Sequence, residues 1–182
     1  MNKAVFLDKD GTINEDTGYV SHYHDLKLLP HSAEAIKLLN EAGYKVIVIS
    51  NQSGVARGYL GEDMLQTLNK TLQKKLLVKG AFVDEIYYCP HHAEHGLFPY
   101  RRECECRKPN IGLIKKAVKR HNIDLSKSFM VGDHSKDIEA GHKAGTKTVL
   151  VLSGHGKESE MKIKPDHTTK DLLDAVKWIL GG

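Results

Sequence analysis

Two aspartates near the N-terminus are close enough in the sequence to act together in metal binding or catalysis. Asp8 and Asp10 follow a short apolar run, and Gly11 behind them permits a sharp backbone turn. Two close carboxylates repel each other, and they become tolerable when a hard cation lies between them or when one holds a proton. The pair predicts metal-assisted or acid–base chemistry, and a solvated turn is the plainer alternative.

The three cysteines lie close together beside two histidines. Cys89 and His91 are separated by one residue, as are Cys104 and Cys106. Three thiolates and one imidazole would fill all four positions of a tetrahedral zinc ion, so the spacing predicts a structural zinc site. His92 is the alternative fourth ligand. The simpler alternative is that the three cysteines are unrelated free thiols. An odd cysteine count without a secretion signal argues against a disulfide framework. Other histidines are scattered and predicted to be surface or structural residues: His22, His24, His31, His121, His142 and His155.

Short apolar runs alternate with segments of helical periodicity along the chain. The runs predict strands over residues 4–7, 46–49, 86–88, 129–131 and 148–152, with a possible edge strand near residue 167. Helices are predicted after Pro30 and over residues 62–78, 111–120, 136–144 and 172–180. The apolar face of the 62–78 helix is predicted to comprise Met64, Leu65, Leu68, Leu72, Leu76 and Leu77. This alternation predicts a Rossmann-like three-layer α/β/α fold around a central parallel sheet.

Polar residues at the ends of these strands should converge, because ligands of open α/β sheets bind beyond the carboxyl ends of the strands. Ser50 and Asn51 follow the second predicted strand, and Asp133 follows the fourth. Lys108 lies just before the helix over 111–120. With the N-terminal aspartates, they provide the nucleophile, the cation site and the positive charge that phosphoryl transfer requires.

Size and charge limit the possible functions. Residues 1–182 are most simply one domain, in which 89–106 form the zinc loop. A balance of 27 Lys+Arg against 23 Asp+Glu gives a net charge of +4, which suits an anionic small-molecule substrate and is too weak to argue for nucleic acid. No stretch approaches the ~20 apolar residues of a membrane helix, and the N-terminus lacks a signal-peptide pattern. We therefore expect a cytoplasmic protein, and nothing demands more than a monomer.

The set of polar residues resembles the haloacid dehalogenase superfamily of phosphatases over nearly the whole chain. The superfamily's four motifs are matched in order by Asp8-x-Asp10-Gly11-Thr12, Ser50, Lys108, and Gly132-Asp133 with Asp137. The resemblance implies the fold of that superfamily. One loop and one helix fill the segment from residue 11 to residue 46, which leaves no room for a large cap domain.

By this resemblance, four residues are catalytic. Asp8 would be the nucleophile, attacking phosphorus to give an aspartyl-phosphate. Asp10 would protonate the leaving oxygen and then take a proton from the water that hydrolyses the intermediate. The Ser50 hydroxyl and the Lys108 ammonium would hold the phosphoryl oxygens as charge develops on them.

The resemblance also implies a catalytic Mg²⁺, held by Asp8, the backbone carbonyl of Asp10, and Asp133. Such a cation offsets the repulsion between a carboxylate nucleophile and a phosphate dianion. Asp137 is expected to orient its neighbours rather than to bind the metal.

The zinc loop over 89–106 leads directly into Arg107-Lys108-Pro109, and this arrangement points to particular families within the superfamily. It is similar to the D-glycero-D-manno-heptose 1,7-bisphosphate 7-phosphatases and the closely related histidinol-phosphate phosphatases, and stretches 16–20, 50–58 and 104–109 favour the former. The implied reaction removes the C7 phosphate to leave heptose 1-phosphate, a step toward nucleotide-activated heptose. A histidinol-phosphate phosphatase is the alternative enzyme. A non-catalytic phosphate-binding module stabilised by zinc is the alternative of a different class.

The narrower resemblance implies substrate contacts at Asp16, Gly18, Tyr19, Asn51, Ser53, Arg107 and Lys108. The first three would border the sugar, and the next two would lie near the phosphoryl end. Arg107 would meet the distal C1 phosphate, since a guanidinium matches phosphate geometry at two points. The chain departs from the pattern at Ser50, where Thr is common, and at His134, where some relatives carry Lys.

Overall fold

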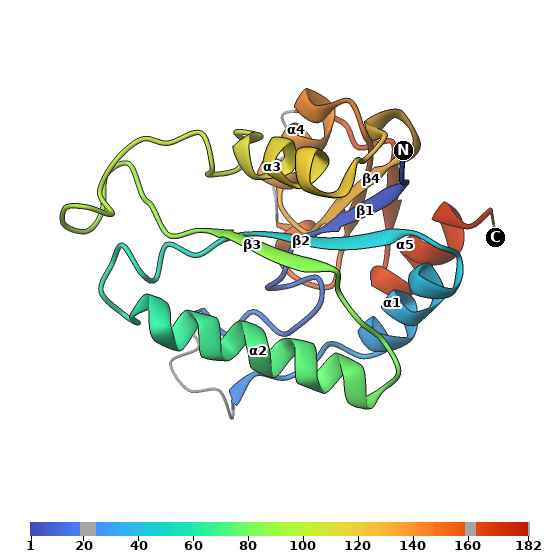
Figure 1. The fold of residues 1–182 in the computed structure, drawn as a ribbon, viewed down its shortest axis with the longest axis horizontal. Helices are drawn as coiled ribbons and strands as arrows, with labels where there is room; N and C mark the ends of the chain where they lie inside the picture. The colour runs from blue at the N-terminus through green and yellow to red at the C-terminus, as the bar shows by residue number, and fades with distance from the viewer. Residues whose placement is uncertain (19–24, 159–162, 182) are drawn as a thin grey trace.

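The structure is a computed structural model that describes residues 1–18, 25–158 and 163–181 (Figure 1). Its strands are β1 (Ala4–Leu7), β2 (Lys45–Asn51), β3 (Glu85–Cys89), β4 (Phe129–Gly132), β5 (Lys147–Val151) and β6 (His167–Thr169). Its helices are α1 (Ser32–Glu41), α2 (Glu62–Val78), α3 (Gly112–His121), α4 (Ser135–Ala144) and α5 (Leu172–Ile179). The predicted elements are all present, including the short edge strand, and the predicted fold class is confirmed.

The strands form one six-stranded parallel sheet in the order β3-β2-β1-β4-β5-β6. The strand order reverses beside β1, and in open α/β sheets the crevice at such a switch point is where ligands bind. At the end of β1, Leu7 lies opposite Val48 of β2 and Val131 of β4. The residues that follow these three strands therefore emerge side by side at one edge of the sheet.

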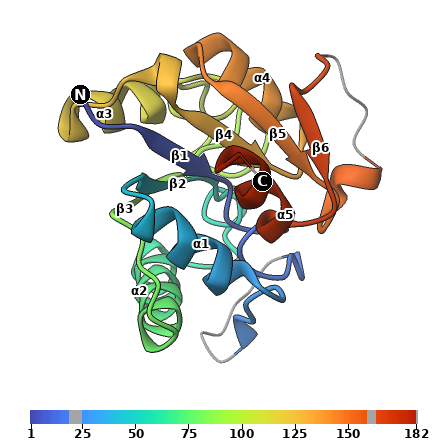
Figure 2. The ribbon, with the colours of Figure 1, turned by 90° about the vertical axis from the view of Figure 1, so that its right-hand side faces the viewer.

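Helices cover both faces of the sheet. Figures 1 and 2 show α1, α2 and α5 on one face and α3 and α4 on the other. Successive residues of β1 alternate between the two cores: Val5 and Leu7 pack on the α1/α2/α5 side, and Ala4 and Phe6 pack on the α3/α4 side. This two-sided burial explains why the central strands are continuously apolar instead of alternating with polar residues.

The prediction that Leu77 belongs to the buried face of α2 is wrong. Leu72 and Leu76 are fully buried, whereas the Leu77 side chain is 67% exposed. Residues spaced three or four apart share one face of a helix, and the next residue is turned about 100° away. Leu77 follows Leu76 directly, so it points to solvent.

The described connections around the sheet edge are loops. No domain-sized cap is present in the described residues between β1 and α1 or between β3 and α3. Figure 1 shows the β3–α3 loop extending well away from the sheet. None of the described helices is long and apolar enough to cross a membrane.

The burial contrast within α2 gives the first testable prediction. Leu72→Ala should lower the free energy of unfolding by about 2–5 kcal/mol, because it removes buried methyl groups and leaves a cavity. Leu77→Ala is the matched control on the same helix and should change that free energy by less than about 0.5 kcal/mol. Urea unfolding of both variants measures the difference, and equal losses would contradict the packing described for α2.

Candidate active site

A lysine and two aspartates from distant segments meet in the interior at the carboxyl edge of the sheet. The Nζ of Lys108 lies 2.7 Å from Asp8 Oδ1 and 2.7 Å from Asp137 Oδ1, and it donates to the Ile49 carbonyl at 2.6 Å. All three side chains are buried. Burial by itself lowers the pKa of Lys108, but the charges of Asp137 and Asp8 outweigh it and hold that pKa above its ordinary value. The lysine therefore stays charged within this cluster.

The same cluster keeps Asp8 ionised. Burial acts to raise the pKa of Asp8, but the positive charges of Lys108 and Lys136 outweigh it, so that pKa is lowered. An ionised carboxylate is what a nucleophile requires, and Asp8 also lies directly after the central strand.

Asn51 holds the main chain of Lys108 in place. Its side-chain amide donates to the Lys108 carbonyl and accepts from the Lys108 amide, both at 3.0 Å. The amide group is therefore engaged with protein, although Asn51 also lines the cavity beside Asp8. The predicted contact of Asn51 with substrate stays a prediction.

Asp133 completes a group of three carboxylates. One carboxylate oxygen from each of Asp8, Asp133 and Asp137 lies within 4.8 Å of the others. The backbone N–H of His155 donates to Asp133 Oδ2 at 2.8 Å, while Asp133 Oδ1 is buried without a partner among the described residues. Burial and the charge of Asp8 raise the pKa of Asp133 to about 7. The buried Asp133 carboxylate, with one oxygen unpartnered among the described residues and the Asp8 carboxylate beside it, fits a divalent cation such as Mg²⁺.

Two glycines allow the chain to approach Asp133 closely. A Cβ on Gly11, whose φ is +82°, would lie 2.3 Å from Asp133 Oδ2, and a Cβ on Gly154 would lie 2.2 Å from the same atom. Any side chain at either position would displace the carboxylate, so both positions require glycine.

Asp10 lies in its own hydrogen-bond network. Its Oδ2 accepts from Gln52 Nε2 at 2.7 Å, and the same amide donates to Ser50 Oγ at 2.7 Å. Its Oδ1 accepts from Asn14 at 2.8 Å and from Lys9 at 2.7 Å. The Asp10 carboxylate thus lies outside the three-carboxylate group, and the predicted metal contact through its backbone carbonyl stays a prediction.

A cavity of about 330 Å³ opens in front of Asp8. Its described lining is Asp8, Asp10, Asp16, Gly18, Ser50, Asn51, Gln52, Ser53, Gly54, His134, Lys136 and His155. The predicted substrate contacts at Asp16, Gly18 and Ser53 are therefore brought to the site. Tyr19, also a predicted contact, lies outside the described residues.

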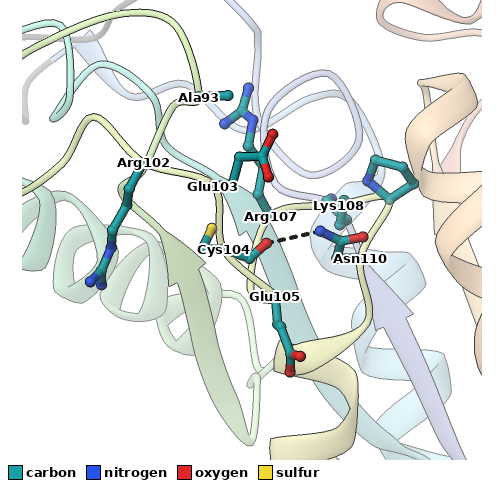
Figure 3. Close-up of a pocket in the computed structure, with 9 residues that line it drawn as sticks. Ala93, Arg102, Glu103, Cys104, Glu105, Arg107, Lys108 and Asn110 are labelled. Atoms are coloured by element: carbon teal, nitrogen blue, oxygen red, sulfur yellow. Dashed lines mark hydrogen bonds between the residues drawn. The ribbon is translucent and has the colours of Figure 1, made fainter.

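Arg107 lines a second, open cavity of about 620 Å³ on the β3–α3 loop, together with Lys108 and Asn110 (Figure 3). Arg107 Nη1 donates to the His91 carbonyl at 3.0 Å, and Asn110 donates to the Cys104 carbonyl at 2.8 Å. Arg107 is not among the described residues that line the cavity in front of Asp8. Its predicted contact with a distal phosphate stays a prediction.

The four predicted zinc ligands come together in this loop. Cys106 Sγ lies 3.0 Å from Cys89 Sγ, 3.2 Å from Cys104 Sγ and 3.2 Å from His91 Nδ1. Three thiols and one imidazole so arranged fit a four-coordinate metal ion. The Nδ1 of His92 instead accepts backbone N–H groups in its own turn, at 3.1 and 3.2 Å.

Sequence reasoning missed several residues at the cavity. His155 was predicted to be a surface or structural residue, yet its Nε2 lies 3.2 Å from Asp16 Oδ2 and its ring centroid lies 5.3 Å from that of His134. Its place in the loop that follows the fifth strand was the available signal. Gln52 and Lys136 also follow strand ends, beside residues that were singled out.

Comparisons with known proteins agree with this geometry. A family model described as "HAD-hyrolase-like" matches residues 105–175. The chain is 42% identical over 182 residues to the D-glycero-beta-D-manno-heptose-1,7-bisphosphate 7-phosphatase of Pasteurella multocida, covering 100% of this chain and 98% of the relative. It is 39% identical to the D-glycero-D-manno-heptose-1,7-bisphosphate 7-phosphatase of Chlorobaculum tepidum, covering 98% and 95%.

A solved structure is similar over almost all of its length. The D,D-heptose 1,7-bisphosphate phosphatase of B. bronchiseptica, complexed with magnesium and phosphate, aligns with a TM-score of 0.88 at 31% identity, covering 98% of each chain. With these relatives matched end to end, the chain belongs to the heptose-1,7-bisphosphate 7-phosphatase family of haloacid dehalogenase-like hydrolases.

Proposed function

We propose that this chain is a Mg²⁺-dependent phosphatase that removes the C7 phosphate of D-glycero-D-manno-heptose 1,7-bisphosphate, leaving heptose 1-phosphate for the synthesis of nucleotide-activated heptose. The observation that carries the proposal is the buried ion pair between Asp8 and Lys108, beside Asp133. The names of the full-length relatives support the substrate and do not favour histidinol phosphate. Because phosphate charges prevent such a sugar from crossing a membrane unaided, we expect the reaction to take place in the cytoplasm.

In the proposed mechanism, Asp8 attacks phosphorus and forms an aspartyl-phosphate. Lys108 keeps Asp8 ionised before the attack and balances negative charge as the phosphoryl group arrives. Asp137 holds the lysine from the other side, and it also accepts from the His134 backbone N–H at 3.0 Å.

Asp10 is the proposed general acid and base. Protonated, it donates to the leaving sugar oxygen; ionised, it takes a proton from the water that hydrolyses the intermediate. The side-chain amide of Gln52 orients the Asp10 carboxylate by donating to its Oδ2. The same amide donates to the hydroxyl of Ser50, which is proposed to contact the phosphoryl oxygens.

Asp8 and Asp133 would hold the Mg²⁺, with the backbone carbonyl of Asp10. The unpartnered Asp133 Oδ1 and the close packing of the carboxylates support this assignment. When bound, the ion offsets the repulsion between the Asp8 carboxylate and the phosphate dianion.

Zinc is proposed for the Cys89–His91–Cys104–Cys106 cluster, as a structural ion that fixes the loop leading to Lys108. Zinc on Nδ1 of His91 leaves the ring proton on Nε2. The exposed Arg102, whose Nη2 lies 2.8 Å from that Nε2, would then turn away, because a guanidinium has no acceptor.

A first test separates the enzyme from a non-catalytic phosphate-binding module. Asp8→Asn should lower turnover by about three orders of magnitude or more, since it removes the nucleophile. Lys108 keeps Asp137 as a partner, so the protein should remain folded by circular dichroism. Asp63→Asn, the same change at an exposed site, is the control, and full activity of Asp8→Asn would rule out the mechanism.

A second test concerns the second phosphate of the substrate. Arg107→Gln should lower kcat/KM for the heptose bisphosphate by about tenfold to a hundredfold and leave that for a heptose 7-monophosphate nearly unchanged, because only the former has a phosphate for Arg107 to meet. Exposed Arg101→Gln is the control on the same loop. Equal kinetics of Arg107→Gln and the wild type on the bisphosphate would exclude this contact.

A third test concerns the zinc ion, measured by elemental analysis and thermal melting. The wild type should carry one zinc per chain, and His91→Asn should lose most of it and melt at lower temperature. His92→Asn is the matched control, because an Asn oxygen still accepts the backbone N–H groups in that turn, and it should keep its zinc. The assignment would be contradicted if the wild type contained no zinc and its melting temperature equalled that of His91→Asn.

A further inference from the structure

Lys136, in the first turn of α4, is a cavity residue that the proposed mechanism does not use. Its side chain is half-buried, and it lines the cavity in front of Asp8. We propose that Lys136 binds the phosphoryl group of the incoming substrate, at the end that Asp8 attacks. This inference rests on the proposed phosphatase function and assigns a substrate-binding residue to it.

The charges around the cavity leave this task to Lys136. Three carboxylates line the cavity, those of Asp8, Asp10 and Asp16, and all of them repel a phosphate dianion. Lys108 is enclosed by its own carboxylate partners and has no exposed side-chain surface. Among the described residues that line this cavity, Lys136 is the only Lys or Arg. A phosphate that enters therefore meets Lys136 as the accessible cation.

The ammonium of Lys136 is available for a ligand. In the described part of the chain it makes no ion pair and no side-chain hydrogen bond. It nevertheless lies near the nucleophile, because Lys136 and Asp8 line the same cavity of about 330 Å³. A cation so placed can reach the phosphoryl group beside Asp8 without leaving a protein partner.

The position of Lys136 on its helix disfavours a structural explanation. A positive charge in the first turn of a helix opposes the helix dipole, whereas the acidic Asp137 beside it is favoured there. Lys143 offers the contrast: it lies in the last turn of α4, where the dipole favours a cation, and pairs with Glu139 at 2.8 Å. No ion pair of this kind joins Lys136 to another described residue of α4, so binding of an anion explains its place better than helix stability does.

The location also distinguishes the two phosphates of the proposed substrate. Lys136 lines the cavity of Asp8, where the transferred phosphoryl group must lie. Arg107 lines the neighbouring cavity on the β3–α3 loop, where a distal phosphate would be met. Lys136 should therefore act on any phosphate monoester, whereas Arg107 should act only on the bisphosphate.

The test compares Lys136→Gln, Lys136→Arg and the control Lys143→Gln, all with Mg²⁺. We expect Lys136→Gln to raise KM for both the heptose bisphosphate and p-nitrophenyl phosphate by about tenfold to a hundredfold, because a charge-assisted hydrogen bond is lost. The inhibition constant of inorganic phosphate should rise by a similar factor. Lys136→Arg should restore most of the loss, and Lys143→Gln should behave as the wild type. The melting temperature of Lys136→Gln should be unchanged or higher.

Three results would overturn the proposal. These are an unchanged KM and phosphate inhibition in Lys136→Gln, an equal loss in Lys136→Arg, and a loss confined to the bisphosphate. Failure of the proposed function looks different: the wild type would then hydrolyse p-nitrophenyl phosphate and not the heptose bisphosphate. In that case p-nitrophenyl phosphate and inorganic phosphate still decide the role of Lys136.

Discussion

The Lys108 ammonium is buried between Asp8 and Asp137, and this pair of ion pairs constrains the chain at the carboxyl edge of the sheet. Burying one charge without its partner is strongly unfavourable, and breaking such a buried pair typically costs about 3–5 kcal/mol. Each of the two carboxylates therefore needs the lysine, and the lysine needs a carboxylate partner. They come from the end of β1, from the segment before α3 and from the first turn of α4. The sheet brings them to one point because β1 lies between β2 and β4.

The loop between β3 and α3 must hold Lys108, the proposed catalytic lysine, although it has little regular structure of its own. Asn51 fixes the main chain of Lys108 from β2. Glu62 of α2 accepts from the hydroxyls of Tyr88 in β3 and Tyr100 in the loop, both at 2.8 Å. The cysteine–histidine cluster ends at Cys106, two residues before the lysine. A structural ion in that cluster would restrain the same segment, which would explain why the proposed metal ligands precede the proposed catalytic lysine so closely.

Three buried carboxylates in one small volume create a strong demand for positive charge. Lys108 balances part of this charge from within the protein, while burial and the charge of Asp8 raise the pKa of Asp133 to about 7. Gly11 and Gly154 let two loops approach Asp133 Oδ2 closely, and the Asp133 side chain is fully buried. The acidic site is thus arranged for a divalent cation, and a substrate phosphate is the anion that such a cation brings in.

Local sequence patterns predicted the strands and helices that the structure contains, and they also supplied the residues that we propose to carry the chemistry. Each central strand is buried on both faces and therefore appears in the sequence as an apolar run, and helices appear as segments of helical periodicity. The aspartates of the motifs and the closely spaced cysteines and histidine can also be recognised from local spacing. Tertiary structure alone decided that Leu77 faces solvent, that Gln52 joins Asp10 to Ser50, that His155 reaches Asp16, and that Arg107 lines a separate cavity. These facts depend on the direction of a side chain and on partners that are often distant in the sequence, and no local pattern encodes either.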